Sequence, residues 1–167
     1  FVYSNFGISV LGLVLESIYS DSFTNIMNDF IRNDLHLQNT QAAKQNGNLN
    51  KYWKWQQNDG YIPAGSIISN IESMAIYLQL YMNNTISYLP MTYSKIKDIN
   101  ANQAAYEAMN IRMDSVGMTW MLDNKNDIIW HNGATTDFNS YIGFTQDRQR
   151  GVVILSNLSA NDKISMT

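Results

Sequence analysis

Apolar residues recur at helical spacing in the first part of the chain. Ile8, Leu11, Leu15 and Ile18 form one such stripe, and further apolar residues between them widen it. This pattern predicts a mostly buried helix over about residues 5–19. The run over residues 38–50 has no apolar period and contains a glycine, so we expect a loop there.

Two further helices are indicated by their first residues. Ser22, followed by Asn25, begins a second helical pattern, and Ser69, with Glu72 three residues later, has the form of a capping box. Asn83 and Asn84 should end the third helix. A weaker pattern favours another helix around residues 102–109.

Beyond Gly117 the pattern changes to short apolar runs separated by turn residues. These runs cover residues 118–122, 128–130, 140–145 and 152–155. Connections this short require antiparallel neighbours, because a parallel crossover needs about a dozen residues. The prediction is an α+β fold, with a helical region over residues 1–116 and an antiparallel sheet meander over residues 117–167. The last run is apolar on both faces, so we expect helices on each side of that strand.

Charge and composition exclude several classes of function. The net charge is −3, and the 11 basic residues are scattered, so no basic stripe is available to bind nucleic acid. The chain contains no cysteine, and its two histidines lack the paired spacing of a metal site, so we expect no metal and no cofactor. No apolar stretch reaches the roughly 18 residues of a membrane span.

Tyr3-Ser4-Asn5, just before the first helix, is the first candidate for chemistry. A phenol and an amide two residues apart at a helix entry can both face one cleft, where the phenol relays a proton and the amide holds a substrate carbonyl. The structural alternative is a helix-capping Asn5 beside a core Tyr3.

The second candidate is the segment Trp130-His131-Asn132-Gly133-Ala134, at the end of a predicted strand. Histidine changes charge near neutral pH, glycine permits close approach of a ligand, and a strand edge offers N–H groups to an oxyanion. The alternative is a structural or merely exposed histidine in a turn.

The combination of motifs resembles the serine β-lactamase and penicillin-binding-protein superfamily, in its class C-like branch of hydrolases, esterases and peptidases. The stretches that carry this resemblance are Tyr3-Ser4-Asn5, residues 35–40, Pro63-Ala64-Gly65-Ser66, His131-Asn132-Gly133 and the strands that follow it. The resemblance implies a β-lactamase/transpeptidase-like fold and an acyl-enzyme mechanism on an ester, amide, D-amino-acid peptide or β-lactam. It also implies export to the periplasm, cell surface or medium.

The resemblance implies a role for each matching residue. Tyr3 would exchange protons with the nucleophile and leaving group, and Asn5 would contact the substrate. His131 would take the position of the third motif and approach Tyr3 across one cleft that Asn5 lines. Gly133 and Ala134 would line the site, with the Ala134 N–H as an oxyanion donor. The superfamily's Ser-x-x-Lys nucleophile should precede Tyr3, so we expect the chain to be part of a longer protein and to be inactive alone. We also expect it to associate with itself or with a complementary fragment.

Departures from the superfamily pattern leave a second function open. Asp34 and His36 replace the usual proline and glycine, Asp137 replaces a common glycine, and His131 replaces the lysine of true β-lactamases. The last change favours an esterase or peptidase, whereas the others favour an inactive binding or scaffold domain. Ser94-Lys95-Ile96-Lys97 matches Ser-x-x-Lys literally, but its position predicts a solvated loop. Tyr52, Trp53 and Trp55 are candidates for lining a cleft, with simple packing as the alternative.

Overall fold

The computed structural model describes residues 1–43, 53–56, 58–99, 101, 104, 108 and 111–158. The chain forms two compact units: a helical unit, Val2–Ser73, and a sheet unit that contains Met74–Thr167. The predicted boundary at residue 116 separates a helix-rich from a strand-rich part of the sequence and does not describe compact units. It therefore stays a prediction.

Helix α1 (Asn5–Tyr19) has the predicted bounds and begins at Ser4, whose hydroxyl accepts a hydrogen bond from the Gly7 N–H. The prediction that it is mostly buried is wrong for the described chain. Leu11 is 52% exposed and Ile18 is 68% exposed. Only a narrow strip is buried, where Gly12 lies so close to the Pro63 ring of α3 (Ile62–Gly65) that no Cβ would fit between them.

Helix α2 (Phe23–Asn33) begins as predicted, because the Ser22 hydroxyl accepts from the Asn25 N–H at 3.3 Å. It ends in a tight turn: the N–H of Leu35 donates to Phe30, and that of Leu37 donates to Ile31. His36 lies between them with φ of 56°, the left-handed conformation typical of a helix C-terminus.

The rest of the helical unit is a short helix and a two-stranded ribbon. Strand β1 (Gln41–Ala42) pairs antiparallel with β2 (Ile67–Ile68), which follows α3 (Ile62–Gly65). The loop expected over residues 38–50 therefore contains a strand at its start. Two residues are too few to show a period in the sequence. Residues 44–50 lie outside the described chain.

Helix α4 (Ile71–Met82) is capped by a different residue from the one predicted. The Asn70 side chain accepts from the Ser73 N–H at 2.9 Å, whereas the Ser69 hydroxyl pairs with the Thr40 hydroxyl at 2.7 Å. Asn is as good a cap as Ser, and the long-range partner of Ser69 decides between them. The helix ends as predicted before Asn84, where φ is 48°.

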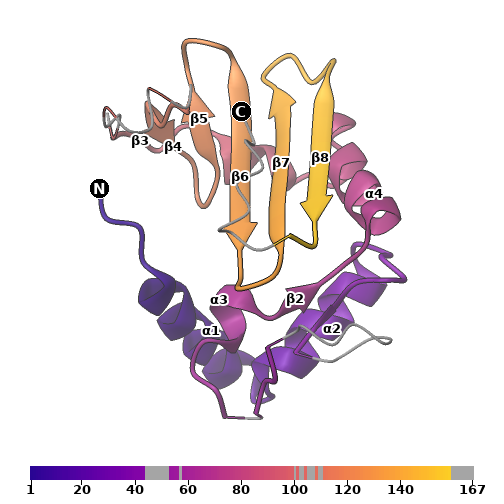
Figure 1. Cartoon of the computed structure of the whole chain (residues 1–167). Helices are drawn as coiled ribbons and strands as arrows, with labels where there is room; N and C mark the ends of the chain where they lie inside the picture. The colour runs from indigo at the N-terminus through magenta and orange to yellow at the C-terminus, as the bar shows by residue number, and fades with distance from the viewer. Residues whose placement is uncertain are drawn as a thin grey trace. The chain divides into compact units, whose positions relative to one another are not determined.

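The sheet unit contains six antiparallel strands in the order β3-β4-β5-β6-β7-β8 (Figure 1). The four predicted strands are present in sequential order, as β5 (Met121–Asp123), β6 (Ile128–Ala134), β7 (Asn139–Thr145) and β8 (Gly151–Ser156). The fold class, helices followed by an antiparallel meander, is therefore confirmed. Strands β3 (Lys97–Asp98) and β4 (Ser115–Val116) and the short helix α5 (Leu89–Tyr93) were not predicted. The helix expected over residues 102–109 falls almost wholly outside the described residues.

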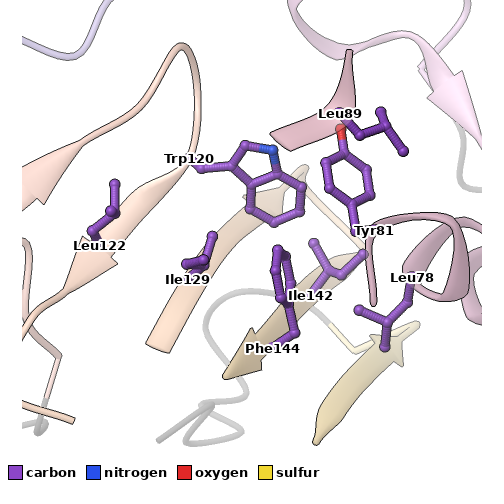
Figure 2. Packing of buried hydrophobic residues seen from close by; sticks show 8 residues of the cluster. All are labelled: Leu78, Tyr81, Leu89, Trp120, Leu122, Ile129, Ile142 and Phe144. Atoms are coloured by element: carbon purple, nitrogen blue, oxygen red, sulfur yellow. The ribbon is translucent and has the colours of Figure 1, made fainter. Parts of the chain in front are cut away.

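The core of the sheet unit lies between α4 and one face of the sheet. Aromatic rings dominate it: Tyr81 packs edge-on against Trp120, and Trp120 packs edge-on against Phe144, with centroids 4.9 and 5.4 Å apart (Figure 2). Five aliphatic residues complete the cluster: Leu78, Leu89, Leu122, Ile129 and Ile142. This core packs against β6 and β7, and β6 carries the His-x-Gly segment.

Strand β8 is covered on one face only among the described residues. On the core side Val153 packs on the cluster, and Gly151 lies so close to α4 that a Cβ would be 2.6 Å from the sulfur of Met82. On the opposite face Val152 is 46% exposed. The prediction of helices on both sides is therefore wrong for the described chain.

No single helix of the described residues is long and apolar enough to cross a bilayer. Only α1 and α2 taken together pass a test of length and composition, and they are bent by 82° at their junction.

Candidate functional site: a Tyr-x-Asn helix entry and a strand edge

The helix cap settles one alternative for the Tyr-x-Asn segment. Ser4 supplies the capping oxygen of α1, so the Asn5 side chain is not the cap. Tyr3 is 56% exposed, so it is not a core residue of the chain. The capping-and-core interpretation is therefore wrong, and both side chains belong to the accessible N-terminal end of α1.

His131 lies inside β6 rather than in a turn after it, because the strand continues to Ala134. Its register partner is Ile142, and with Ile129 it belongs to the face of the sheet that bears the core. The side chain is half-buried. Burial lowers the pKa of His131, and a hydrogen bond with the Asn132 backbone opposes this shift. The imidazole is therefore mainly a free base at pH 7, which suits a proton acceptor.

The direction of the backbone groups in β6 follows from hydrogen bonds at the two ends of the β6–β7 hairpin. The Gln146 N–H donates to Asp127 at one end, and the Thr135 N–H donates to Phe138 at the other. Residues two apart in a strand point their backbone groups to the same side. Residues 129, 131 and 133 therefore bond to β7, and the N–H groups of Asn132 and Ala134 point away from it.

The opposite edge of β6 is open beyond Trp130. Strand β5 pairs with β6 only from Asp123 to Met121, and Met121 lies opposite Trp130. Among the described strands, residues 131–134 thus have a partner on the β7 side alone. The Ala134 N–H points to this uncovered edge, which is where an oxyanion donor must lie.

Gly133 allows a neighbouring strand to approach the same segment. A Cβ at Gly133 would lie 2.9 Å from the hydroxyl oxygen of Ser140, its register partner, and this hydroxyl donates to the Gly133 carbonyl at 3.5 Å. Ser140 was not among the sequence candidates. The pairing register, which the sequence does not reveal, is what brings it beside Gly133 on the face that bears His131.

The beta-lactamase family matches residues 1–165, which is nearly the whole chain. The chain belongs to the beta-lactamase family. Its fold, helices with an antiparallel sheet, is the β-lactamase/transpeptidase fold shared by the solved structures below.

The following relatives of this family member are distant in sequence. Protein flp of Staphylococcus aureus strain MRSA252 is 21% identical over 96% of the chain and 34% of its own length. The octameric penicillin-binding protein homologue from Pyrococcus abyssi superposes with a TM-score of 0.73 at 18% identity, over 95% of this chain and 39% of the homologue. A β-lactamase/D-alanine carboxypeptidase from Yersinia pestis superposes with a TM-score of 0.73 at 17% identity, over 98% of this chain and 51% of the carboxypeptidase. The chain therefore spans about a third of the curated relative and at most about half of these structures.

The candidate residues divide between the two units of this family member. Tyr3 and Asn5 belong to the helical unit, and His131, Gly133 and Ala134 belong to the sheet unit. The approach of Tyr3 to His131 across one cleft therefore stays a prediction. Among the described residues, no three His, Asp or Glu side chains gather as a metal site.

Ser94-Lys95-Ile96-Lys97 is not the family's nucleophile motif. The Ser94 hydroxyl donates to the Pro90 carbonyl at the end of α5, and Lys95 forms an exposed ion pair with Asp98 at 3.2 Å. Ile96 is 64% exposed. The prediction of a solvated loop is confirmed for this segment, although Lys97 also pairs within β3.

Two of the three aromatic residues expected near a cleft lie in the described chain. Trp53 and Trp55 pack edge to face with centroids 5.7 Å apart, and both rings lie over Gly65 of α3. Trp53 remains 45% exposed. Tyr52 lies outside the described residues, and the assignment of these rings to a substrate cleft stays a prediction.

Proposed function

We propose that this chain supplies the Tyr-x-Asn and His-x-Gly parts of the active site of a β-lactamase-like serine hydrolase. Its reaction is acyl transfer: a serine upstream of Tyr3 attacks an ester, amide, D-amino-acid peptide or β-lactam, and water resolves the acyl-enzyme. Family membership supports this class of chemistry. The observation that carries the proposal is the Ala134 N–H, which points to the open edge of β6.

Each candidate residue has a step in this proposal. The Tyr3 phenol relays a proton: its oxygen accepts the hydroxyl proton of the attacking serine while its own proton moves to the leaving group. The Asn5 amide holds a substrate carbonyl. The His131 imidazole, held neutral by burial, hydrogen-bonds near the leaving group. The Ala134 N–H stabilises the negative oxygen of the tetrahedral intermediate together with the N–H of the serine itself. We further propose an exported protein, as for the superfamily in general.

The direct test is acylation and turnover by the full-length protein. We expect a fluorescent penicillin or a p-nitrophenyl ester to label one serine upstream of Tyr3, as shown by mass spectrometry of the digested protein. Tyr3→Phe should lower kcat by roughly a hundredfold or more. Tyr19→Phe is the matched control, because Tyr19 is an exposed tyrosine at the other end of the same helix.

Ala134→Pro tests the observation on which the proposal rests. Proline removes the N–H, and this N–H makes no bond to β7, so the hairpin keeps its ladder. We expect kcat to fall roughly a hundred- to a thousandfold, with an unchanged far-ultraviolet circular dichroism spectrum. Equal activity of the folded variant and the wild type would remove Ala134 from the site.

A binding or scaffold domain without catalysis is the second candidate function. Asp34, His36 and Asp137 favour it, since they depart from the superfamily pattern. A folded full-length protein that is neither acylated nor able to turn over any of the four substrate classes would establish this alternative.

A further inference from the structure

The Gly133 carbonyl and the Ala134 N–H belong to the same peptide group. Because a trans peptide is planar, its C=O and its N–H point in opposite directions. The Gly133 carbonyl is therefore directed to β7, while the Ala134 N–H is directed to the open edge of β6. A hydrogen bond to this carbonyl acts on the proposed oxyanion donor through the resonance of the amide.

A side-chain hydroxyl lies on this carbonyl. The Ser140 hydroxyl donates to the Gly133 oxygen at 3.5 Å, from the position of β7 directly opposite Gly133. The absence of a side chain at position 133 allows this approach, because a Cβ there would be 2.9 Å from the Ser140 Oγ. The Ser140 side chain thus occupies the space next to the Gly133–Ala134 peptide group, on the face of the sheet that bears His131.

The bond from Ser140 is long in this structure, and it should strengthen when a tetrahedral intermediate forms. Hydrogen bonds in a chain polarise one another. Donation by the Ala134 N–H to a negative oxygen increases the negative charge on the Gly133 oxygen, which then accepts more strongly from the Ser140 hydroxyl. Catalytic hydrogen bonds that are long in an unliganded site often tighten in this way. An interaction that is stronger in the transition state than in the ground state raises kcat.

We propose that Ser140 is a positioning residue for the oxyanion donor. Its hydroxyl orients and polarises the Gly133–Ala134 peptide group, which makes the Ala134 N–H a better donor to the negative oxygen. This inference rests on the proposed function, and it assigns Ser140 a role that is exerted through the peptide group. Polarisation changes a hydrogen bond by roughly 10–30%, and one oxyanion donor contributes roughly a hundred- to a thousandfold, so the effect on kcat should be about two- to eightfold.

Ser140→Ala in the full-length protein tests this role, with a p-nitrophenyl ester as substrate. We expect kcat to fall about two- to eightfold. KM should change little, because acylation and deacylation both pass through a negative tetrahedral intermediate that the same donor stabilises. The far-ultraviolet circular dichroism spectrum should be unchanged.

Ser156→Ala is the matched control. Ser156 is also a half-buried serine of the sheet, and its hydroxyl oxygen accepts from the Leu158 N–H at 3.2 Å. The control therefore removes a hydroxyl and one hydrogen bond at the end of β8, away from the Gly133–Ala134 peptide group. It should leave kcat unchanged.

A double-mutant cycle with Ala134→Pro separates positioning from a merely structural role. Proline removes the N–H through which Ser140 acts, so Ser140→Ala should cause no further loss of kcat in that background. A structural role would lower kcat by the same factor in both backgrounds, because independent effects add in free energy.

Three results would overturn the role of Ser140: an unchanged kcat in Ser140→Ala, an equal loss in Ser156→Ala, or an equal loss in the wild-type and Ala134→Pro backgrounds. Acylation and turnover by the wild type would still uphold the hydrolase in each of these cases. A wild type that is neither acylated nor able to turn over the ester would overturn the proposed function and this inference with it.

Discussion

At the scale of single residues, one departure from the superfamily pattern lies at a backbone position that disfavours a side chain. The resemblance to the superfamily implies a glycine at the position of His36, and the φ of His36, 56°, is in the left-handed region. Glycine adopts this conformation without the steric cost that a side chain brings. The turn between α2 and β1 is thus retained, although the residue that favours it is absent.

His36→Gly should therefore stabilise the full-length protein by about 1 kcal/mol. The loss of the exposed contact between the His36 ring and the Arg32 carbonyl, at 3.3 Å, should offset little of this gain. Urea denaturation measures the change. Asp34→Gly is the control, because Asp34 has a right-handed φ of −97° and should lose about 1 kcal/mol. Equal effects of the two substitutions would contradict this account.

His131 should make stability depend on pH. Burial lowers the pKa of His131 in the folded state below its value of about 6.5 in the unfolded chain. The unfolded state then binds more protons between these two values. The free energy of unfolding should therefore decrease as pH falls through about 6.5. Above about pH 6.5 this loss of stability should be absent.

Comparing the wild type with His131→Gln isolates this effect. Thermal unfolding between pH 8 and pH 5 should show a smaller loss of stability in the variant, since glutamine does not titrate. Parallel curves for the two proteins would show that the imidazole is not held neutral by its surroundings.

At the scale of elements, close contact between α4 and β8 depends on a glycine. A Cβ at Gly151 would lie 2.6 Å from the Met82 sulfur and 2.8 Å from a Leu78 methyl carbon. Both are side-chain atoms next to the core, so they can move only by disturbing their neighbours. This contact fixes how the helix covers the end strand of the described sheet.

Gly151→Ala should destabilise the sheet unit by about 1–3 kcal/mol, the usual cost of overpacking. The shift of the unfolding midpoint in guanidinium measures it. Gly60→Ala is the matched control, because nothing lies within 4 Å of the position its Cβ would take. A neutral Gly151→Ala would mean that α4 and β8 are more loosely packed than the structure shows.

At the scale of the whole molecule, the described chain exposes apolar surface in each unit. One patch is the outer side of α1, with Phe6 and Leu13 exposed by 69% and 60%. The other is strand β8, where Val152 on one face and Leu155 on the opposite face are exposed by 46% and 37%. Strand β8 is also the last strand in the order of the described sheet. End strands and apolar patches of this kind favour association.

We therefore expect the 167-residue chain to self-associate. Sedimentation equilibrium at several concentrations should give an average mass that rises above 19.1 kDa. Val152→Lys, on an exposed position of the end strand, should lower this mass, because lysine on an edge opposes strand pairing. A mass that stays at the monomer value at every concentration would contradict the prediction.

The sequence determined the features that depend on near neighbours along the chain. The bounds of α1 follow from helical periodicity after Ser4, and the start of α2 follows from the Ser22 cap. The order of the four strands from β5 to β8 follows from connections too short for a parallel crossover. The motifs with Tyr3 and His131 also stand in the sequence itself, together with the family resemblance that they carry.

Tertiary structure decided what depends on partners far away in the chain. The two-residue strand β1 exists only because β2 pairs with it, and Asn70 caps α4 because Ser69 is bonded to Thr40. Burial of α1 could not be predicted, since an apolar stripe shows which face can be buried but not whether a neighbour covers it. The direction of the Ala134 N–H is likewise set by the β6–β7 register, because a shift of one residue would turn it toward β7.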